Sequence, residues 1–145
     1  MNSWGKLGFH ASVNIDVENP TIPGTALIWK NSFPVTDIFT LVLCRAQLAV
    51  LGPYMLLNIY ASSGSDKNFE RSEFFGQDLF RGISLNPGAM WICGGVFNYV
   101  IKTIDVEGGV GFNQKFFPAL KELVRSNGFC DVFRHKFPRK EEFTF

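Results

Sequence analysis

The chain has 145 residues, a formal net charge of +1, and 46% hydrophobic against 19% charged residues. This length allows one domain with a hydrophobic core and leaves too little for two, while the composition excludes a disordered chain. The near-neutral charge provides no basic field that would by itself indicate nucleic-acid binding. Sixteen phenylalanines predict a core built from many large, flat side chains.

The three cysteines are widely spaced and have no histidine or cysteine partner at metal-binding distance in the sequence. They imply neither a zinc site nor a disulfide framework, and they are typical of reduced thiols. The amino-terminal residues contain no apolar segment of signal-peptide length, and the longest apolar stretch, 46–61, is interrupted by Pro53 and Asn58. We therefore expect an intracellular chain without a membrane partner.

The first half of the chain predicts a sheet. Residues 1–23 have little periodicity and predict a loop with at most an edge strand. Residues 24–30, 40–50 and 54–61 each predict a strand, and a Gly-Pro turn makes the last two antiparallel. These three strands together predict a meander.

A helix follows over residues 69–83, where Phe75, Leu79 and Ile83 recur at helical spacing. The polar residues before it offer an N-cap at Ser65 or Asp66. This segment predicts a helix that packs on the sheet.

The second half alternates strand and helix. Residues 89–95 are apolar on both faces and predict a central strand covered on both sides. Residues 116–128 predict a helix, with Pro118 in its first turn and Gly128 after its end. Residues 129–137 predict a last strand. The mixture of elements indicates a layered α/β domain.

Candidate binding residues lie at two strand ends. Alternation places Asn58 and Tyr60 on one face of the strand 54–61, near its carboxyl end, and Val96 and Asn98 follow the strand 89–95. Ligands of layered α/β sheets bind outside the carboxyl ends of strands. The alternative is that these polar side chains only satisfy backbone groups of nearby loops. Both interpretations remain open on the pattern alone.

Five motifs in order carry a family resemblance: "LLNIYASSG", "ERSEFF", "MWICGGVFNYV" with "TID" after it, "ALKELVRSNGFCDVFRHKFP", and "EEFTF". From about Gly24 to Phe145 they resemble the endonuclease domain of LINE-type (non-LTR) retrotransposons. That domain is part of the endonuclease/exonuclease/phosphatase superfamily. The resemblance implies one partial domain over 1–145, with 1–23 outside the match, and a four-layered α/β sandwich incomplete at both ends.

The chemistry that the resemblance implies is Mg²⁺-assisted hydrolysis of DNA phosphodiesters. In the family, a tyrosine at the position of Tyr60 contacts the phosphate, and a Gly-Asp-Phe-Asn motif supplies a water-activating aspartate and a phosphate-holding asparagine. Here the motif reads Gly-Val-Phe-Asn, so Asn98 matches and Val96 stands in place of the aspartate. Thr144 matches a position near the DNA-facing surface of the cleft, and Ser63 stands where retroelement copies often carry asparagine. Thr144, Ser63 and Asn58 are the candidate DNA contacts. The family's other metal-binding and catalytic residues have no counterpart here.

Valine cannot accept a proton or bind a metal, so we expect this chain alone to be catalytically impaired or inactive, with doubtful Mg²⁺ binding. Two alternatives remain: a nuclease completed by flanking sequence or a partner, and a non-catalytic DNA- or protein-interaction module. The module would contact DNA weakly through basic residues, namely Arg125, Arg134, Lys136, Arg139 and Lys140. Unpaired sheet edges predict self-association, and action on DNA would place the protein in the nucleus.

Overall fold

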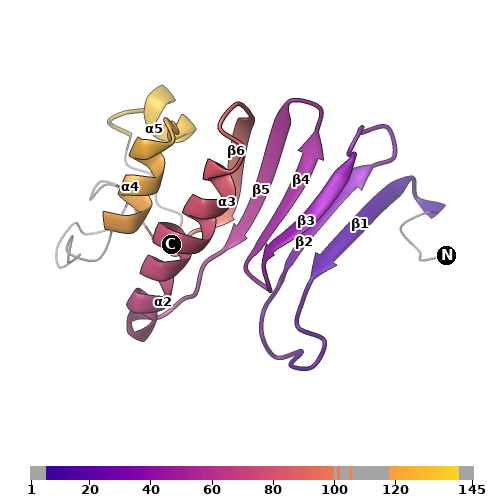
Figure 1. Ribbon diagram of the computed structural model, residues 1–145, viewed down its shortest axis with the longest axis horizontal. Coiled ribbons are helices and arrows are strands. Elements are labelled where there is room, and N and C mark those ends of the chain that lie inside the picture. The colour runs from indigo at the N-terminus through magenta and orange to yellow at the C-terminus, as the bar shows by residue number, and fades with distance from the viewer. Residues whose placement is uncertain (1–5, 100, 102–104, 106–117, 141–145) are drawn as a thin grey trace. The chain divides into compact units, whose positions relative to one another are not determined.

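The computed structural model describes residues 6–99, 101, 105 and 118–140 (Figure 1). They form two compact units. The first unit combines Met1–Ser62 with Leu85–Phe97, and the second combines Ser63–Ser84 with Asn98–Phe145. All described strands belong to the first unit and all described helices from residue 65 onward to the second.

The first unit contains two sheets. The smaller one pairs β1 with β2 in antiparallel orientation, and the larger one has the order β3-β4-β5-β6 (Figure 1). β5 and β6 run parallel, and the other neighbouring pairs run antiparallel. The strands are β1 (Phe9–Asn14), β2 (Thr25–Lys30), β3 (Asp37–Val42), β4 (Ala46–Leu51), β5 (Tyr54–Tyr60) and β6 (Met90–Val96).

The predicted strand over 40–50 is wrong, because the chain reverses in its middle. β3 ends at Val42, β4 begins at Ala46, and Cys44 between them has a positive φ of 61°. The Oδ1 atom of Asn14 accepts a hydrogen bond from the Cys44 amide at 2.9 Å, which holds this turn. The meander therefore comprises β3, β4 and β5, whereas β2 pairs with β1 in the other sheet.

β6 also differs from its prediction as a covered central strand. Among the described residues it forms one edge of its sheet, with β5 as its neighbour. The side chains of Met90, Ile92 and Val96 on one face of β6 are about half exposed. An apolar sequence on both faces therefore does not place β6 at the centre of the sheet.

The second unit begins with a 3-10 turn, Ser65–Lys67, that leads into one continuous helical segment. This segment comprises α2 (Asn68–Glu73), a π-helical turn (Phe74–Leu79) and α3 (Phe80–Ser84). Phe75, Leu79 and Ile83 are buried, as their spacing predicts. The predicted N-cap is wrong, because the 3-10 turn places Lys67 at the cap position of α2.

Two further helices follow. α4 (Pro118–Ser126) begins at the proline and is followed by Gly128, whose φ of 66° and neighbouring Phe129-to-Val124 backbone hydrogen bond (2.9 Å) end the helix as predicted. Residues 116 and 117 of that prediction lie outside the described residues. The last predicted strand is instead helix α5 (Val132–Lys136), because the Asp131 carboxylate caps it by accepting from the Arg134 amide at 2.9 Å.

Within the described ranges, no helix has the length and apolar character that a bilayer crossing requires.

Candidate functional site

The predicted site residues of the first unit lie on neighbouring parallel strands. Tyr60 of β5 is the register partner of Val96 of β6, and Asn58 is the partner of Gly94. The Ala61 amide continues this ladder by donating to the Val96 carbonyl at 2.8 Å. Register partners share a face of the sheet, so Asn58, Tyr60 and Val96 lie together at the carboxyl ends of both strands.

The two glycines before Val96 have different roles. A Cβ built on Gly95 would lie 2.0 Å from the carbonyl oxygen of Ile59, and Gly95 has a φ of 127°. A Cβ on Gly94 would meet nothing within 4 Å. Gly95 is therefore required by the close approach of the β5 backbone, while Gly94 faces open space.

Arg45 is a candidate binding residue that was not among those predicted from the sequence. Its guanidinium carbon lies 5.3 Å from the centroid of the Tyr60 ring, and its carbonyl accepts from the Tyr60 amide at 2.8 Å. Both side chains are half-buried. The signal was the charged residue in the middle of the apolar run 40–50, which marks the turn between β3 and β4.

Asn14 holds the turn that carries Arg45. Its side chain is 3% exposed, and its Nδ2 atom lies 3.0 Å from the Val42 carbonyl and 3.3 Å from the Ala46 carbonyl, on either side of the turn. The Nδ2 atom also lies 3.2 Å from Oγ1 of the buried Thr25. Together with the bond from the Cys44 amide, these contacts fix the β3–β4 turn from the smaller sheet.

Asn58 makes a structural contact. Its Nδ2 atom donates to the Ala26 carbonyl of β2 at 3.0 Å, so it links the two sheets. Gln47, its register partner on β4, is buried and donates through Nε2 to Oγ of Ser12 at 2.7 Å. The face with Asn58 and Gln47 is therefore the face that meets the smaller sheet.

The remaining predicted residues lie elsewhere. Asn98 and Ser63 belong to the second unit. Asn98 has a positive φ of 48° and precedes the buried Tyr99, whose ring stacks on Phe75 at a centroid distance of 5.4 Å. Ser63 is exposed, and Thr144 lies outside the described residues.

The basic residues considered for DNA contact are not equivalent. Arg134 is 4% exposed, forms an ion pair with Asp105 and donates to the Lys140 carbonyl, so it is a buried structural residue. The other basic residues of the group are exposed.

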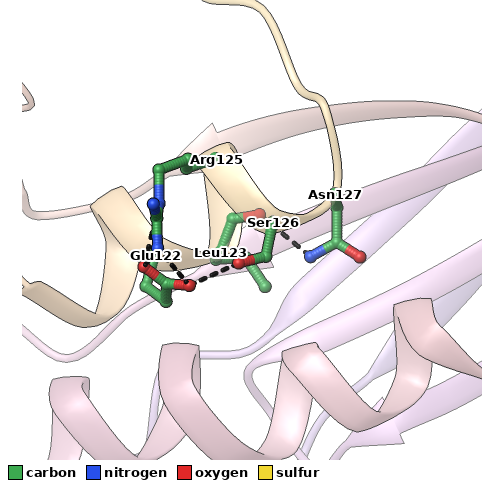
Figure 2. A network of polar contacts seen from close by, with 5 residues as sticks. All are labelled: Glu122, Leu123, Arg125, Ser126 and Asn127. Atoms are coloured by element: carbon green, nitrogen blue, oxygen red, sulfur yellow. Dashed lines mark hydrogen bonds and ion pairs between the residues drawn. The ribbon is translucent and has the colours of Figure 1, made fainter.

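The exposed Arg125 is itself engaged on the surface of α4. It contacts the Glu122 carboxylate, with Nη2 and Oε2 2.9 Å apart (Figure 2). Hydrogen bonds from Ser126 and Arg125 lower the pKa of Glu122. Glu122 thus stays ionised and offsets part of the Arg125 charge.

The side chains at the carboxyl ends of β5 and β6 are not the ligands that Mg²⁺ prefers. This ion prefers carboxylate oxygens, whereas the side chains there are an amide, a phenol, a valine and a guanidinium. In the part of the chain that the structure describes, no three His, Cys, Asp or Glu side chains gather in a way that could hold a metal ion. The described residues of this site therefore do not fit the metal of the predicted chemistry.

The fold resembles that of a solved endonuclease structure. An AP endonuclease from Archaeoglobus fulgidus superposes with a TM-score of 0.75 at 19% sequence identity, over 98% of this chain. The match covers 60% of that enzyme's chain. No family model matches the sequence, and no curated protein matches it. The chain thus has a mixed α/β, AP endonuclease-like fold and spans less than two thirds of the length of this structural neighbour.

Proposed function

We propose that this chain is an endonuclease-type domain that binds the phosphate backbone of DNA without hydrolysing it. We further propose that it derives from the endonuclease domain of a LINE-type retrotransposon and acts in the nucleus. The AP endonuclease-like fold supports the first part, and the order of the five sequence motifs supports the second.

One observation carries the proposal: Val96 is the register partner of Tyr60 and is 47% exposed at the carboxyl end of β6. In the endonuclease family that the sequence resembles, this position holds the aspartate that activates water. An isopropyl group has no lone pair, so it can neither take a proton from water nor align it. Loss of a general base typically lowers a rate by about 10²- to 10⁴-fold.

The residues beside Val96 remain suited to an anion. The Arg45 guanidinium provides several N–H donors and a permanent positive charge, and the Tyr60 hydroxyl provides one O–H donor. Hydrogen bonds between a guanidinium and a phosphate are charge-assisted and stronger than neutral ones. With the guanidinium over the phenol ring, the pair presents a cation and a donor on one side of the sheet.

A second candidate function is a nuclease completed by additional polypeptide. It is favoured by the length of the structural neighbour, of which this chain covers 60%. Such polypeptide would have to supply both the metal-binding carboxylates and a base near Val96.

The binding part is tested by titrating a fluorescent DNA duplex with the protein at several salt concentrations. We expect weak binding whose affinity falls with salt, and Arg45→Ala should lower the affinity roughly tenfold and reduce the salt slope by about one ion. Arg45→Lys keeps the charge and should retain part of the affinity. Arg81→Ala removes an exposed charge from α3 and is the matched control.

Binding that is equally sensitive to Arg45→Ala and Arg81→Ala would contradict a phosphate site at Arg45. No binding at low salt would contradict the proposal as a whole.

A further inference from the structure

The face of the larger sheet that meets β1 and β2 continues onto β6, where it is exposed. Register places Tyr54 beside Met90, Leu56 beside Ile92 and Tyr60 beside Val96 on this face. Tyr54, Met90, Ile92 and Val96 are between 44% and 54% exposed. A contiguous exposed apolar surface of this kind marks an interaction site. Val96 lies at the strand end beside the proposed anion site; we call the other three exposed residues, Tyr54, Met90 and Ile92, together with Leu56, the β6 face.

The smaller sheet has an open edge directly beside this surface. The Asn31 amide donates to the Gly8 carbonyl at 2.9 Å, so alternation turns the backbone groups of residues 25, 27 and 29 toward β1. The backbone groups of Ala26, Ile28 and Lys30 therefore point to the other edge of β2, where the Lys30 carbonyl accepts from the Phe33 amide at 2.9 Å. There the Ala26 carbonyl accepts from the Asn58 side chain, which places this edge over β5.

β6 offers a second open edge. Its Met90 amide donates to the Pro53 carbonyl at 3.0 Å, and its Val96 carbonyl accepts from Ala61, so the even-numbered residues face β5. The backbone groups of Trp91, Cys93 and Gly95 point away from β5. Within the described residues neither this edge nor that of β2 pairs with another strand.

Among the described residues, these features place the next strand position beside β2 over β6. The register partner of Asn58 is Gly94, and nothing lies within 4 Å of a Cβ built there. A strand that fills this space must be apolar on the side facing the β6 face and must pair through its edge with β2. The β6 strand of a second copy has both an apolar face and an edge that can pair.

We propose that two copies of this chain associate about a twofold axis between the sheets, each placing its β6 in the space beside the other's β2. The two β6 faces then cover one another, and each copy's four-stranded sheet extends the partner's two-stranded sheet. One symmetric contact thus pairs both open edges and buries both apolar surfaces, as expected for an isologous dimer. A second copy fits because the β6 face carries no charge, so the twofold brings apolar residues together.

The oligomeric state tests this directly. Light scattering and sedimentation of the full chain should show a shift with concentration from 16.3 kDa to twice that mass, with a Kd on the order of micromolar. Ile92→Lys should raise this Kd roughly 30-fold or more, since it places a charge at the centre of the β6 face. Ile92 is 54% exposed, so the monomer should keep its melting temperature within a few degrees.

Val13→Lys is the matched control. Val13 is 60% exposed and lies on β1, away from the pairing edge of β2, while its neighbours Ser12 and Asn14 face inward. The same substitution there should change the Kd by less than about threefold. A comparable loss of association in both variants would overturn the proposal.

Hydrogen exchange distinguishes strand pairing from nonspecific contact between apolar faces. Amides of Ile28, Lys30, Trp91, Cys93 and Gly95 should become protected as concentration rises, while amides already paired within the sheets should not change. A monomer at all concentrations, open-ended oligomers, or edge amides that exchange equally fast throughout would each overturn the proposal.

Discussion

Tyr60 and Val96 lie side by side at the ends of two parallel strands, and the Ala61 amide donates to the Val96 carbonyl directly after them at 2.8 Å. An aliphatic side chain thus occupies a half-exposed position beside a phenol and a guanidinium. In the proposed function, Arg45 and Tyr60 hold an anion while Val96 beside them cannot activate water.

A charge at position 96 should weaken DNA binding. Val96→Asp places a carboxylate beside Tyr60 and near the Arg45 guanidinium, where it repels phosphate, and we expect the affinity to fall about fivefold. The asparagine of Val96→Asn has nearly the same shape as that aspartate but no charge, so this variant should bind DNA as tightly as the native chain does. The measurement is the DNA titration at low salt, and equal affinities of the two variants would contradict an anion site at this position.

Gly95 should be essential to the sheet. Gly95→Ala places a methyl group 2.0 Å from the Ile59 carbonyl oxygen at a φ of 127°, and it should lower the free energy of unfolding by about 3 kcal/mol or more. Gly94→Ala is the control, because its Cβ meets nothing within 4 Å, and it should change stability by less than about 1 kcal/mol. Denaturant unfolding measures both, and the reverse order would show that the strand register is wrong.

Asn14 should stabilise the turn that presents Arg45. Asn14→Ala removes the partner of the buried Cys44 amide and of the Val42 and Ala46 carbonyls, and it should cost about 2 to 4 kcal/mol. Because the turn loosens, DNA affinity should fall as well. Asn31→Ala, at an exposed position, should alter neither property. If the Asn14→Ala protein is destabilised but keeps its DNA affinity, Arg45 does not depend on this turn for its position.

The thiols should differ in reactivity. Burial raises the pKa of Cys93 to about 11, so at pH 8 only about 0.1% of it is thiolate. Cys44 is buried and Cys130 is exposed. We expect one fast-reacting thiol in the folded protein, lost in Cys130→Ser, and three after unfolding. A fast thiol that remains in Cys130→Ser would contradict this assignment.

The same shift gives a pH dependence of stability. The folded state keeps Cys93 protonated at pH values where the unfolded chain has ionised. Its contribution to stability is therefore complete below the ordinary thiol pKa and is lost as the pH rises toward about 11. In Cys93→Ala, the alkaline decrease in the free energy of unfolding should be smaller than in the native chain.

Local patterns were sufficient for several elements of the fold. Alternating residues predicted β2 and β5, and the spacing of Phe75, Leu79 and Ile83 predicted the first long helix. The same patterns placed Asn58, Tyr60 and Val96 at or near the carboxyl ends of two strands, and these residues lie near one another because the two strands are neighbours. Each of these predictions depends on neighbours within a few residues.

The elements that were predicted wrongly depend on contacts between distant residues or, for α5, on a single N-cap. The turn at Cys44 is held by Asn14, 30 residues earlier, so the run 40–50 resembles one strand. α5 contains strand-favouring residues, but the Asp131 carboxylate begins a helix there. The edge position of β6 depends on which strands pair, and Arg45 becomes a site residue only through that turn.

The most direct measurement is a nicking assay on supercoiled plasmid with Mg²⁺, at a protein concentration that saturates binding in a parallel titration. We expect bound plasmid that stays supercoiled, for the native chain and for Asn98→Ala alike. Metal-dependent nicking that copurifies with the native chain and disappears in Asn98→Ala would contradict it.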